Sequence, residues 1–442
     1  MNNVNEGFFE KTFKLKAHNT SVRTEIVAGL TTFMTMSYIL IVNPNMLAET
    51  GMDKGGVFTA TILSSVIAII LMGFIANYPF ALAPGMGLNA FFTYTVCLGM
   101  GYDWEFALTA VFLEGVVFLI LSLFKVREAI FDAIPRSLKN AVSVGIGLFI
   151  SLIGLSSAGI IQQGEGTILG FGDLLSPNSA VFFFGLLIMA LLTAKNKKGG
   201  LLIGIVASTI LALILGVTHF PEGGSIFSLP PSMAPVAFKV QFHNIFSFEM
   251  FSILFTFLFV DIFDTVGTLT GVATKADLLD ENGKLPRVGK ALFADAVGTT
   301  VGALFGTSTV TTFVESASGV ADGGRTGLTA LSTGFFFLLA LFIFPIISIV
   351  PSAATAPALV MVGMFMLSPI KDIKFDDYTE VVPAFLTMII MPFAYSIAEG
   401  ISVGMISYVV IKLLTGRHKE ISPLMYILAI IFLLRYLWPL FS

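Results

Sequence analysis

Three carboxylates stand within stretches of sequence that otherwise have the composition of a membrane interior. Asp261 and Asp264 interrupt the apolar run Phe257–Leu269, and Glu315 follows a run of small and β-branched residues. A charge at the centre of a bilayer costs at least a few kcal/mol, so an ionisable residue there is a functional residue by default. Such carboxylates can accept hydrogen bonds from a polar ligand or carry a proton. We therefore expect a polar cavity inside a helical membrane protein.

The spacing of the first two carboxylates adds a second inference. Asp261 and Asp264 are three residues apart, which places them on about the same face of a helix. Two neighbouring buried carboxylates favour protonation of one of them, so one is a candidate proton carrier. Asp261 has a second interpretation, as a hydrogen-bonding residue in helix packing, and the sequence does not separate the two.

Two of the apolar segments contain residues that interrupt a helix. Ala83–Ala90 holds Pro84 with two glycines close behind it, and Gly306–Phe313 is rich in Thr and Ser. Pro and Gly do not continue a helix, and a polar β-branched run favours extended chain. Non-helical backbone survives at membrane depth only where it is buried in protein or lines a cavity. Each break precedes a predicted half-helix, beginning near Asn89 and near Glu315.

The composition gives the fold class. Hydrophobic residues make up 56% and charged residues 12%, with a mean hydropathy of +0.92. Apolar runs of about 18 residues recur along the chain, and none alternates with the period of two that a barrel strand needs. We therefore predict an all-α polytopic membrane protein, with the bilayer as its surroundings and no nucleic acid as a partner.

Positive charges predict the orientation, because cytoplasmic loops are enriched in Lys and Arg. With a cytoplasmic N-terminus, nearly all of the 24 Lys and Arg fall on the cytoplasmic side if fourteen segments cross the membrane. The interrupted segments are then the third and the tenth. Because they are seven segments apart, the two halves of the chain should have inverted topology. The apolar residues 423–441 are left over, as a fifteenth span or a peripheral helix.

Four motifs occur in order along the chain. They are Pro84–Phe92, Val260–Leu269, Gly306–Val320 and Gly323–Leu328. With these motifs the chain resembles the AzgA-like purine permeases of the nucleobase:cation symporter-2 group, over nearly its whole length. The resemblance implies a secondary-active purine importer of the cell membrane. It also implies fourteen transmembrane segments in a seven-plus-seven inverted repeat, with segments 3 and 10 broken by short extended stretches.

The resemblance further implies a core domain that moves against a gate domain. Spans 1–4 and 8–11 form the core, and spans 5–7 and 12–14 form the gate. This fold often forms a homodimer through the gate. The chain then divides into a cytoplasmic N-terminal segment, a first core part, a first gate part, a second core part, a second gate part and an extra C-terminal helix, at residues 1–25, 26–124, 136–217, 248–350, 352–414 and 423–441.

In the family that the chain resembles, the substrate lies between the third and tenth segments. By motif, the residues that hold it are Asp264, Glu315 and Asn89. Glu315 could accept two hydrogen bonds from a purine edge, or it could cap its half-helix without a ligand. Asn89 could cap backbone N–H groups, bind a purine carbonyl, or do both. The other candidates for lining the substrate site are Ala90, Phe91, Thr268, Phe313, Val314 and Thr32, of which Phe91 and Phe313 could stack on a purine or simply belong to the core.

The expected transport is proton symport, with Asp264, Asp261 and Glu315 as the proton-coupling candidates and with no cofactor or metal site. Guanine or hypoxanthine is the expected substrate, and an adenine-preferring permease is the alternative.

An intramembrane aspartyl protease is the alternative from another functional class, because Asp103 and Asp173 occur in short motifs like those of presenilin-type proteases. That mechanism needs two aspartates facing each other within the membrane. Asp103 instead falls in a short turn and Asp173 in a loop at 155–178, both outside the membrane.

Overall fold

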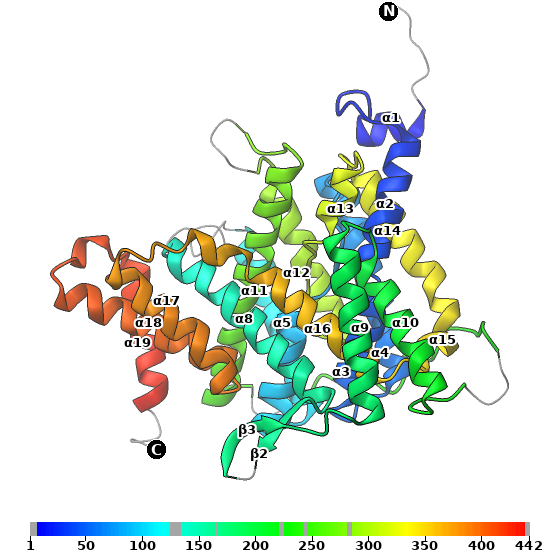
Figure 1. Cartoon of the computed structure of the whole chain (residues 1–442). Coiled ribbons are helices and arrows are strands. Elements are labelled where there is room, and N and C mark those ends of the chain that lie inside the picture. Colours follow the sequence, from blue (N-terminus) through cyan, green and yellow to red (C-terminus); the bar gives the residue numbers. More distant parts are fainter. Residues whose placement is uncertain are drawn as a thin grey trace, which may run out of the picture.

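The computed structural model describes residues 7–123, 134–164, 166–220, 225–242, 245–280 and 285–437. Some residues of the expected parts lie outside these ranges: 1–6 of the N-terminal segment, 124 of the first core part, 165 of the first gate part, 281–284 of the second core part and 438–441 of the C-terminal helix. Most of the described chain is helical, with helix α1 at one end of the bundle and the β2–β3 hairpin at the other (Figure 1).

Helices alternate with short irregular stretches along the chain. In the first half the elements are α1 (Phe8–Phe13), α2 (Val22–Met36), α3 (Ile39–Ala48), α4 (Lys54–Leu71), η1 (Met72–Ala76), β1 (Leu82–Pro84), α5 (Met86–Ala90), η2 (Phe91–Gly99), α6 (Trp104–Leu123), α8 (Arg136–Ser157), β2 (Ile161–Gly164), β3 (Thr167–Phe171), α9 (Pro177–Ala194) and α10 (Gly200–Ile214). In the second half they are α11 (Phe248–Lys275), α12 (Val288–Phe305), β4 (Val310–Thr312), α13 (Ser316–Ala321), α14 (Gly327–Ala340), η3 (Leu341–Ile343), α15 (Phe344–Ser348), α16 (Ser352–Met366), η4 (Ser368–Asp372), α17 (Tyr378–Phe393), α18 (Ile397–Leu414), η5 (His418–Glu420) and α19 (Pro423–Leu437).

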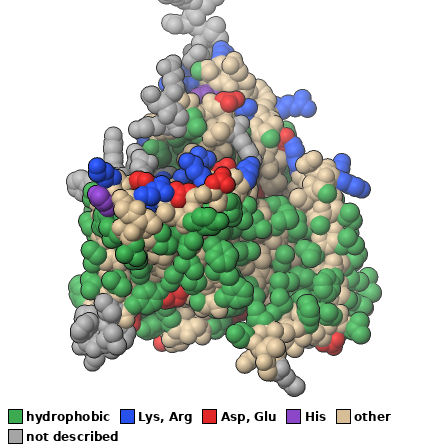
Figure 2. Space-filling view, turned by 60° about the vertical axis from the view of Figure 1, so that its left-hand side comes forward, with side chains coloured by type: hydrophobic (Ala, Val, Ile, Leu, Met, Phe, Trp, Pro, Cys, Tyr) green, Lys and Arg blue, Asp and Glu red, His purple; other side chains and the backbone are tan. Residues whose placement is uncertain are grey.

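The helices have the length and composition of membrane spans. Among the described residues, ten helical stretches are long and apolar enough to cross a bilayer, and α10, α17 and α19 are shorter apolar helices. Figure 2 shows a broad band of hydrophobic side chains, with Lys and Arg gathered above it at the end where Figure 1 places α1. The chain is therefore a multi-pass membrane protein.

Small polar side chains fix the starts of several long helices. In each case a side-chain oxygen accepts a hydrogen bond from the backbone N–H three residues further on, which satisfies one of the donors left open at a helix start. These N-cap residues are Ser21 of α2, Asp53 of α4, Ser176 of α9, Ser247 of α11 and Ser396 of α18.

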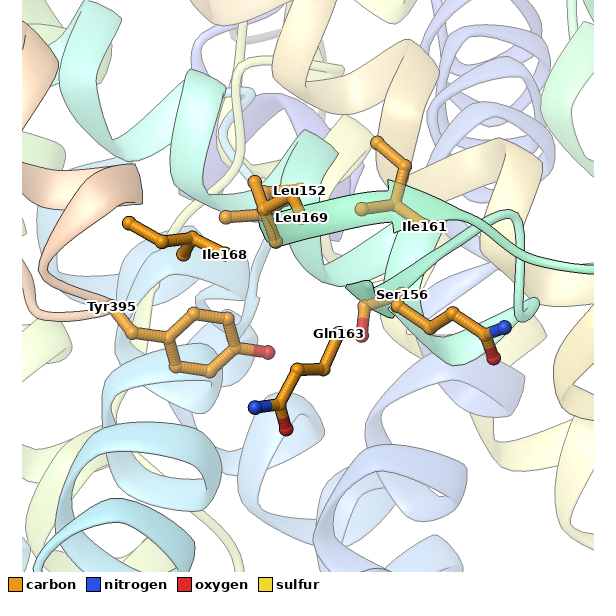
Figure 3. A pocket seen from close by; sticks show the side chains of 8 residues that line it. Leu152, Ser156, Ile161, Gln163, Ile168, Leu169 and Tyr395 are labelled. Carbon is orange, nitrogen blue, oxygen red and sulfur yellow. The ribbon is translucent and has the colours of Figure 1, made fainter. Parts of the chain in front are cut away.

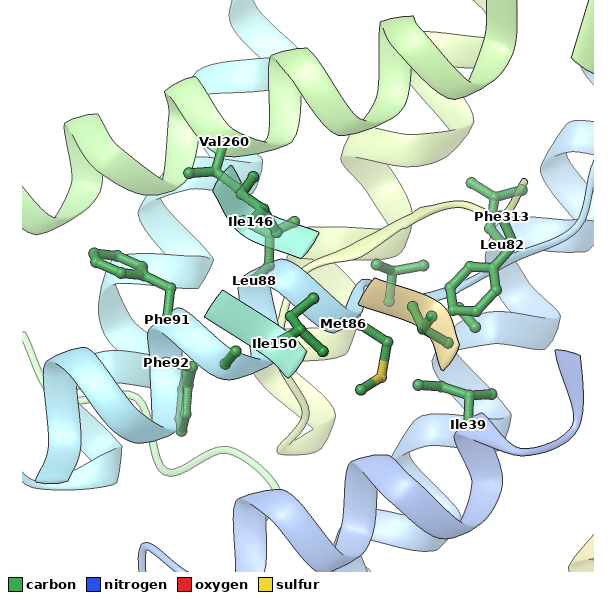
Figure 4. Close-up of a cluster of buried hydrophobic side chains, with 14 of the residues drawn as sticks. Ile39, Leu82, Met86, Leu88, Phe91, Phe92, Ile146, Ile150, Val260 and Phe313 are labelled. Carbon is green, nitrogen blue, oxygen red and sulfur yellow. The ribbon is translucent and has the colours of Figure 1, made fainter. Parts of the chain in front are cut away.

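The helices pack in two groups. In one, α2 packs against α13 and α14, and α12 packs against α4 and α6. In the other, α8 packs against α16 and α17, α9 packs against α10 and α16, and α17 packs against α18. The first group also includes α3, which packs against α4, and α11, which packs against α6. The short helix α5 contacts both groups, since it touches α3 and α11 of the first group and α8 of the second. Figure 4 shows this meeting point, where Ile146 and Ile150 of α8 lie over Met86 and Leu88 of α5.

Two local predictions need correction. Residues 155–178 are not only a loop, because β2 and β3 form an antiparallel hairpin there. The first half-helix begins before Asn89, since α5 starts at Met86 with extended Gly85 as its N-cap. In that case the Pro-Gly pair sets the helix start, and Asn89 lies one turn inside.

Candidate functional site

Two short strands pair at the centre of the site. β1 and β4 pair antiparallel, with Leu82 opposite Thr312 and Pro84 opposite Val310. The N–H of Gly85 donates to the carbonyl of Thr309 at 3.0 Å, which extends the ladder by one bond. Pro84 and the threonines favour extended backbone, so both predicted breaks are present as strands. The pairing holds the starts of α5 and α13 close together, although more than 200 residues separate them in sequence.

Glu315 stands between β4 and α13. It is the N-cap residue of α13 by position, yet its side chain makes no capping hydrogen bond, so the interpretation as a capping glutamate is wrong. Its Oε1 instead accepts a 2.8 Å hydrogen bond from the hydroxyl of Tyr38, at the junction of α2 and α3. The residue is half-buried, and its neighbour Val314 is 51% exposed. The carboxylate is thus held in place beside an open space.

Asp264, on α11, lies close to the same pair of strands. A Cβ built on Gly85 would lie 3.2 Å from Oδ2 of Asp264 and 2.5 Å from Cγ2 of Thr311. Only glycine leaves room there for the carboxylate to approach the turn between β1 and α5. Asp264 is half-buried, as is Thr268 one turn further along α11. Asp264 and Glu315 therefore approach the paired strands from two different elements.

One face of α11 is open beyond Asp264. Gly267 and Gly271 are exposed, and a Cβ on either would meet nothing within 4 Å. After α11 the chain returns to the end that carries α1, since Arg287 lies over the ring of Tyr78 and Asn77 donates to the carbonyl of Phe13. The open face thus leads from the site toward that end of the molecule.

Asp261 belongs to a buried network behind the site. The hydroxyl of Thr265 lies 2.8 Å from Oδ1 of Asp261, 2.9 Å from Oδ1 of Asp295 and 2.6 Å from the hydroxyl of Thr311. All four residues are almost completely buried. The network connects α11 to α12 and to β4. Asp261 therefore makes the hydrogen bonds expected of a helix-packing residue, which is one of its two interpretations.

Asn89 and Ala90 lie fully buried in α5. The Asn89 side-chain amide donates to the carbonyl of Pro84 at 3.4 Å, and Gly85 rather than Asn89 is the N-cap. Among the described residues, Oδ1 of Asn89 has no hydrogen-bond partner. A buried acceptor without a partner costs about 1–3 kcal/mol, so this oxygen is available to a donor on a ligand.

The structure does not bring the remaining predicted residues to one point. Phe91 is fully buried and packs edge-on against Phe257 of α11, with ring centroids 4.8 Å apart. Figure 4 places Phe91 and Phe313 at opposite ends of a buried cluster, so they do not form the two faces of one slot. Thr32 is buried beside α13, because a Cβ on Gly319 would lie 2.1 Å from its hydroxyl oxygen. Its surroundings are those of a helix-packing residue.

Two residues of this region carry no recognisable signal in the sequence. Tyr38 is one aromatic residue among many in an apolar run, and only the fold places its hydroxyl against Glu315. Glu25 lies at the start of α2 and is fully buried. Its carboxylate accepts hydrogen bonds from the backbone N–H groups of Arg325, Thr326 and Thr329 and from both threonine hydroxyls, which caps α14.

Comparisons with known proteins decide the family. Residues 23–403 match the model of a family described as "Permease family". The chain belongs to this permease family. It is 51% identical to the permease MJ0326 of Methanocaldococcus jannaschii, over 98% of each chain. It is 46% identical to the guanine/hypoxanthine permease PbuG of Bacillus subtilis, over 96% of this chain and 99% of that one. It is 43% identical to the adenine permease AdeP of Escherichia coli, over 97% and 96%.

The fold of this permease is shared with more distant transporters. It superimposes on the transmembrane domain of a cyanobacterium bicarbonate transporter, BicA, with a TM-score of 0.60 and 16% identity, over 88% of this chain and 96% of that one. The family match and the relatives named as permeases make the chain a transporter and not an enzyme. Asp103 and Asp173 agree with this, since both are exposed, Asp103 just before α6 and Asp173 in the turn between β3 and α9, where it accepts a hydrogen bond from the N–H of Leu175.

Proposed function

We propose that this permease is a secondary-active importer of purine nucleobases, driven by proton symport. The observation that carries the proposal is the pairing of β1 with β4, which holds two half-helices beside the carboxylates of Asp264 and Glu315. Broken segments at corresponding places in two halves are the best pointer to a transporter binding site. Relatives named as guanine/hypoxanthine and adenine permeases support the substrate class.

The proposed architecture has fourteen segments in an inverted repeat. Pairing of β1 with β4 supports it, because these are the elements that a seven-plus-seven repeat makes equivalent. The two packing groups support the division into core and gate, with the core parts at 26–124 and 248–350 and the gate parts at 136–217 and 352–414. In this proposal the gate moves against the core, and the open face of α11 is the inward route.

The carboxylate chemistry favours guanine or hypoxanthine. Both bases present an N1–H donor, and guanine adds an exocyclic amine, so an ionised Glu315 can accept from one edge of either base. The hydrogen bond from Tyr38 holds the carboxylate in position for this contact. Adenine has an acceptor at N1 and therefore pairs with a protonated carboxylic acid instead. The adenine alternative keeps support from the relatives, since AdeP is nearly as similar in sequence as PbuG.

Proton coupling is assigned to Asp264, with Asp261 and Glu315 as the other candidates. Asp264 is half-buried beside the open face of α11, so it can exchange a proton with water on one side and face the substrate on the other. The gathering of Lys and Arg at the end that carries α1 supports a cytoplasmic N-terminus in a cell membrane. A homodimer through the gate remains a prediction.

An uptake assay tests this function. Cells or proteoliposomes with the permease take up labelled hypoxanthine, with unlabelled guanine, adenine, xanthine and uracil as competitors. Guanine should compete strongly and uracil weakly, and a protonophore should stop uptake whether or not Na⁺ is present. If adenine were the only base to compete, the permease would be the adenine-preferring alternative. Uptake that needs Na⁺ and survives the protonophore would overturn the coupling ion.

A further inference from the structure

A second pocket lies at the end of the molecule opposite α1. Its volume is about 360 Å³, and it is bounded by the last turns of α8, the β2–β3 hairpin and the turn after α17. Figure 3 shows Leu152, Leu169 and Ile168 on one side, with the Tyr395 ring and Gln163 below them. The pocket is distinct from the candidate site, because no residue of that site lines it.

The wall of this pocket is in contact with the broken third segment. The Tyr395 ring meets the Tyr94 ring edge-on at 6.4 Å and the Phe149 ring at 5.3 Å. The hydroxyl of Thr95 donates to the carbonyl of Tyr395 at 3.4 Å. Tyr94 and Thr95 belong to η2, which continues α5 without a gap. Tyr94 is therefore five residues further along the same continuous helical segment than Asn89.

The lining has the chemistry to hold a neutral, flat, hydrogen-bonding molecule. Among the described residues that line the pocket none is charged, and the polar groups are the amides of Gln162 and Gln163 and the hydroxyls of Ser156 and Tyr395. Each amide offers both donors and acceptors, so it can pair with the edge of any purine. An aromatic ring gives a face on which a base can stack, whatever its identity. The volume also lies in the range of ligand sites, about 300–1,000 Å³.

We propose that this pocket is an outer subsite, where a purine nucleobase binds from the side opposite α1 before it reaches the central site. The inference rests on the proposed function, and it adds a second place for the same substrate. Gln162 and Gln163 are exposed, so the subsite is open to solvent. It recognises a nucleobase by stacking on Tyr395 and by amide hydrogen bonds, without the carboxylates that select among purines at the centre.

Transport kinetics measured from each side test the subsite. Tyr395→Ala should raise the KM for uptake of labelled hypoxanthine by at least about fivefold, the change expected from losing one base-stacking contact. Tyr395→Phe keeps the ring and should keep the KM. Efflux from preloaded vesicles should keep its KM in both variants, because that substrate reaches the central site first. Phe171→Ala, at an exposed position of the same hairpin outside the pocket, is the control. An unchanged uptake KM in Tyr395→Ala would overturn the proposal.

Thiol protection tests the subsite directly and without transport. The variant Gln163→Cys in a Cys97→Ser background carries one thiol, in the pocket, for an impermeant maleimide. Hypoxanthine should slow its labelling, and should still do so after Glu315→Gln is added. Protection lost with Glu315→Gln would mean that the thiol only reports occupancy of the central site, which overturns the subsite. A wild-type protein that transports no purine would instead refute the proposed function. Protection of the thiol by hypoxanthine would still test binding in this pocket independently of transport.

Discussion

The hydroxyl of Tyr38 donates a 2.8 Å hydrogen bond to Oε1 of Glu315, across 277 residues of sequence. Tyr38 stands where α2 passes into α3, and Glu315 stands where β4 passes into α13. The bond orients the carboxylate and leaves it further acceptor capacity, because an ionised carboxylate accepts up to about four hydrogen bonds. The junction between α2 and α3 and the junction between β4 and α13 are thus joined by this hydrogen bond.

Tyr38→Phe should weaken purine transport without unfolding the protein. A hydrogen bond to a charged group contributes about 1.5–3 kcal/mol, so the KM for hypoxanthine should rise roughly tenfold to a hundredfold. Tyr426→Phe is the matched control, because its hydroxyl makes only a 3.4 Å contact at an exposed position. Equal KM values for Tyr38→Phe and the control would show that the bond does not orient a substrate-binding group.

Asp264→Asn should uncouple or stop uptake, because an amide keeps the shape of the side chain but does not exchange a proton. Asp264→Glu should retain part of the activity. Uptake is measured in vesicles with and without an inwardly directed proton gradient. Asp277→Asn, an exposed carboxylate just past the end of α11, should behave like wild type. If Asp264→Asn still accumulates purine in response to the gradient, the proton moves through another residue.

Gly85→Ala should disable the site by crowding. The added Cβ would lie 2.5 Å from Thr311 and 3.2 Å from the Asp264 carboxylate, so β1 and β4 must separate. Overpacking of this kind costs about 1–3 kcal/mol, and the melting temperature should fall as transport is lost. Gly289→Ala, where a Cβ meets nothing within 4 Å, should change neither. Full transport by Gly85→Ala would mean that this turn does not shape the site.

Glu25→Ala should destabilise the fold with little effect on substrate preference. Removal of the carboxylate leaves the buried N–H groups of Arg325, Thr326 and Thr329 without their acceptor. The free energy of unfolding should fall by at least about 2 kcal/mol, measured as a lower melting temperature in detergent. Glu10→Ala, which removes only exposed bonds to the N–H of Lys16, should melt like wild type. An unchanged melting temperature for Glu25→Ala would rule out the capping role.

The sequence predicts the broken segments well, because their cause is local. Pro84 and Gly85 interrupt the helix, and the Thr-rich run before Glu315 favours extended chain. The carboxylates can also be predicted from the sequence, since ionisable residues such as Asp264 and Glu315 in apolar sequence indicate a functional site. Contacts between residues that are far apart in the sequence cannot be predicted in this way. Tyr38 has no local feature that separates it from other aromatic residues, and Phe91 resembles a stacking residue until its contact with Phe257 is seen.

The most direct test of the central claim is hypoxanthine transport by Glu315→Gln in proteoliposomes. The substitution keeps the shape of the side chain but turns one acceptor oxygen into a donor that faces the purine N–H. Wild-type protein should accumulate labelled hypoxanthine under an inwardly directed proton gradient. Glu315→Gln should accumulate almost none, at an unchanged melting temperature. A variant with the wild-type KM and rate would remove Glu315 from the substrate site and contradict this account.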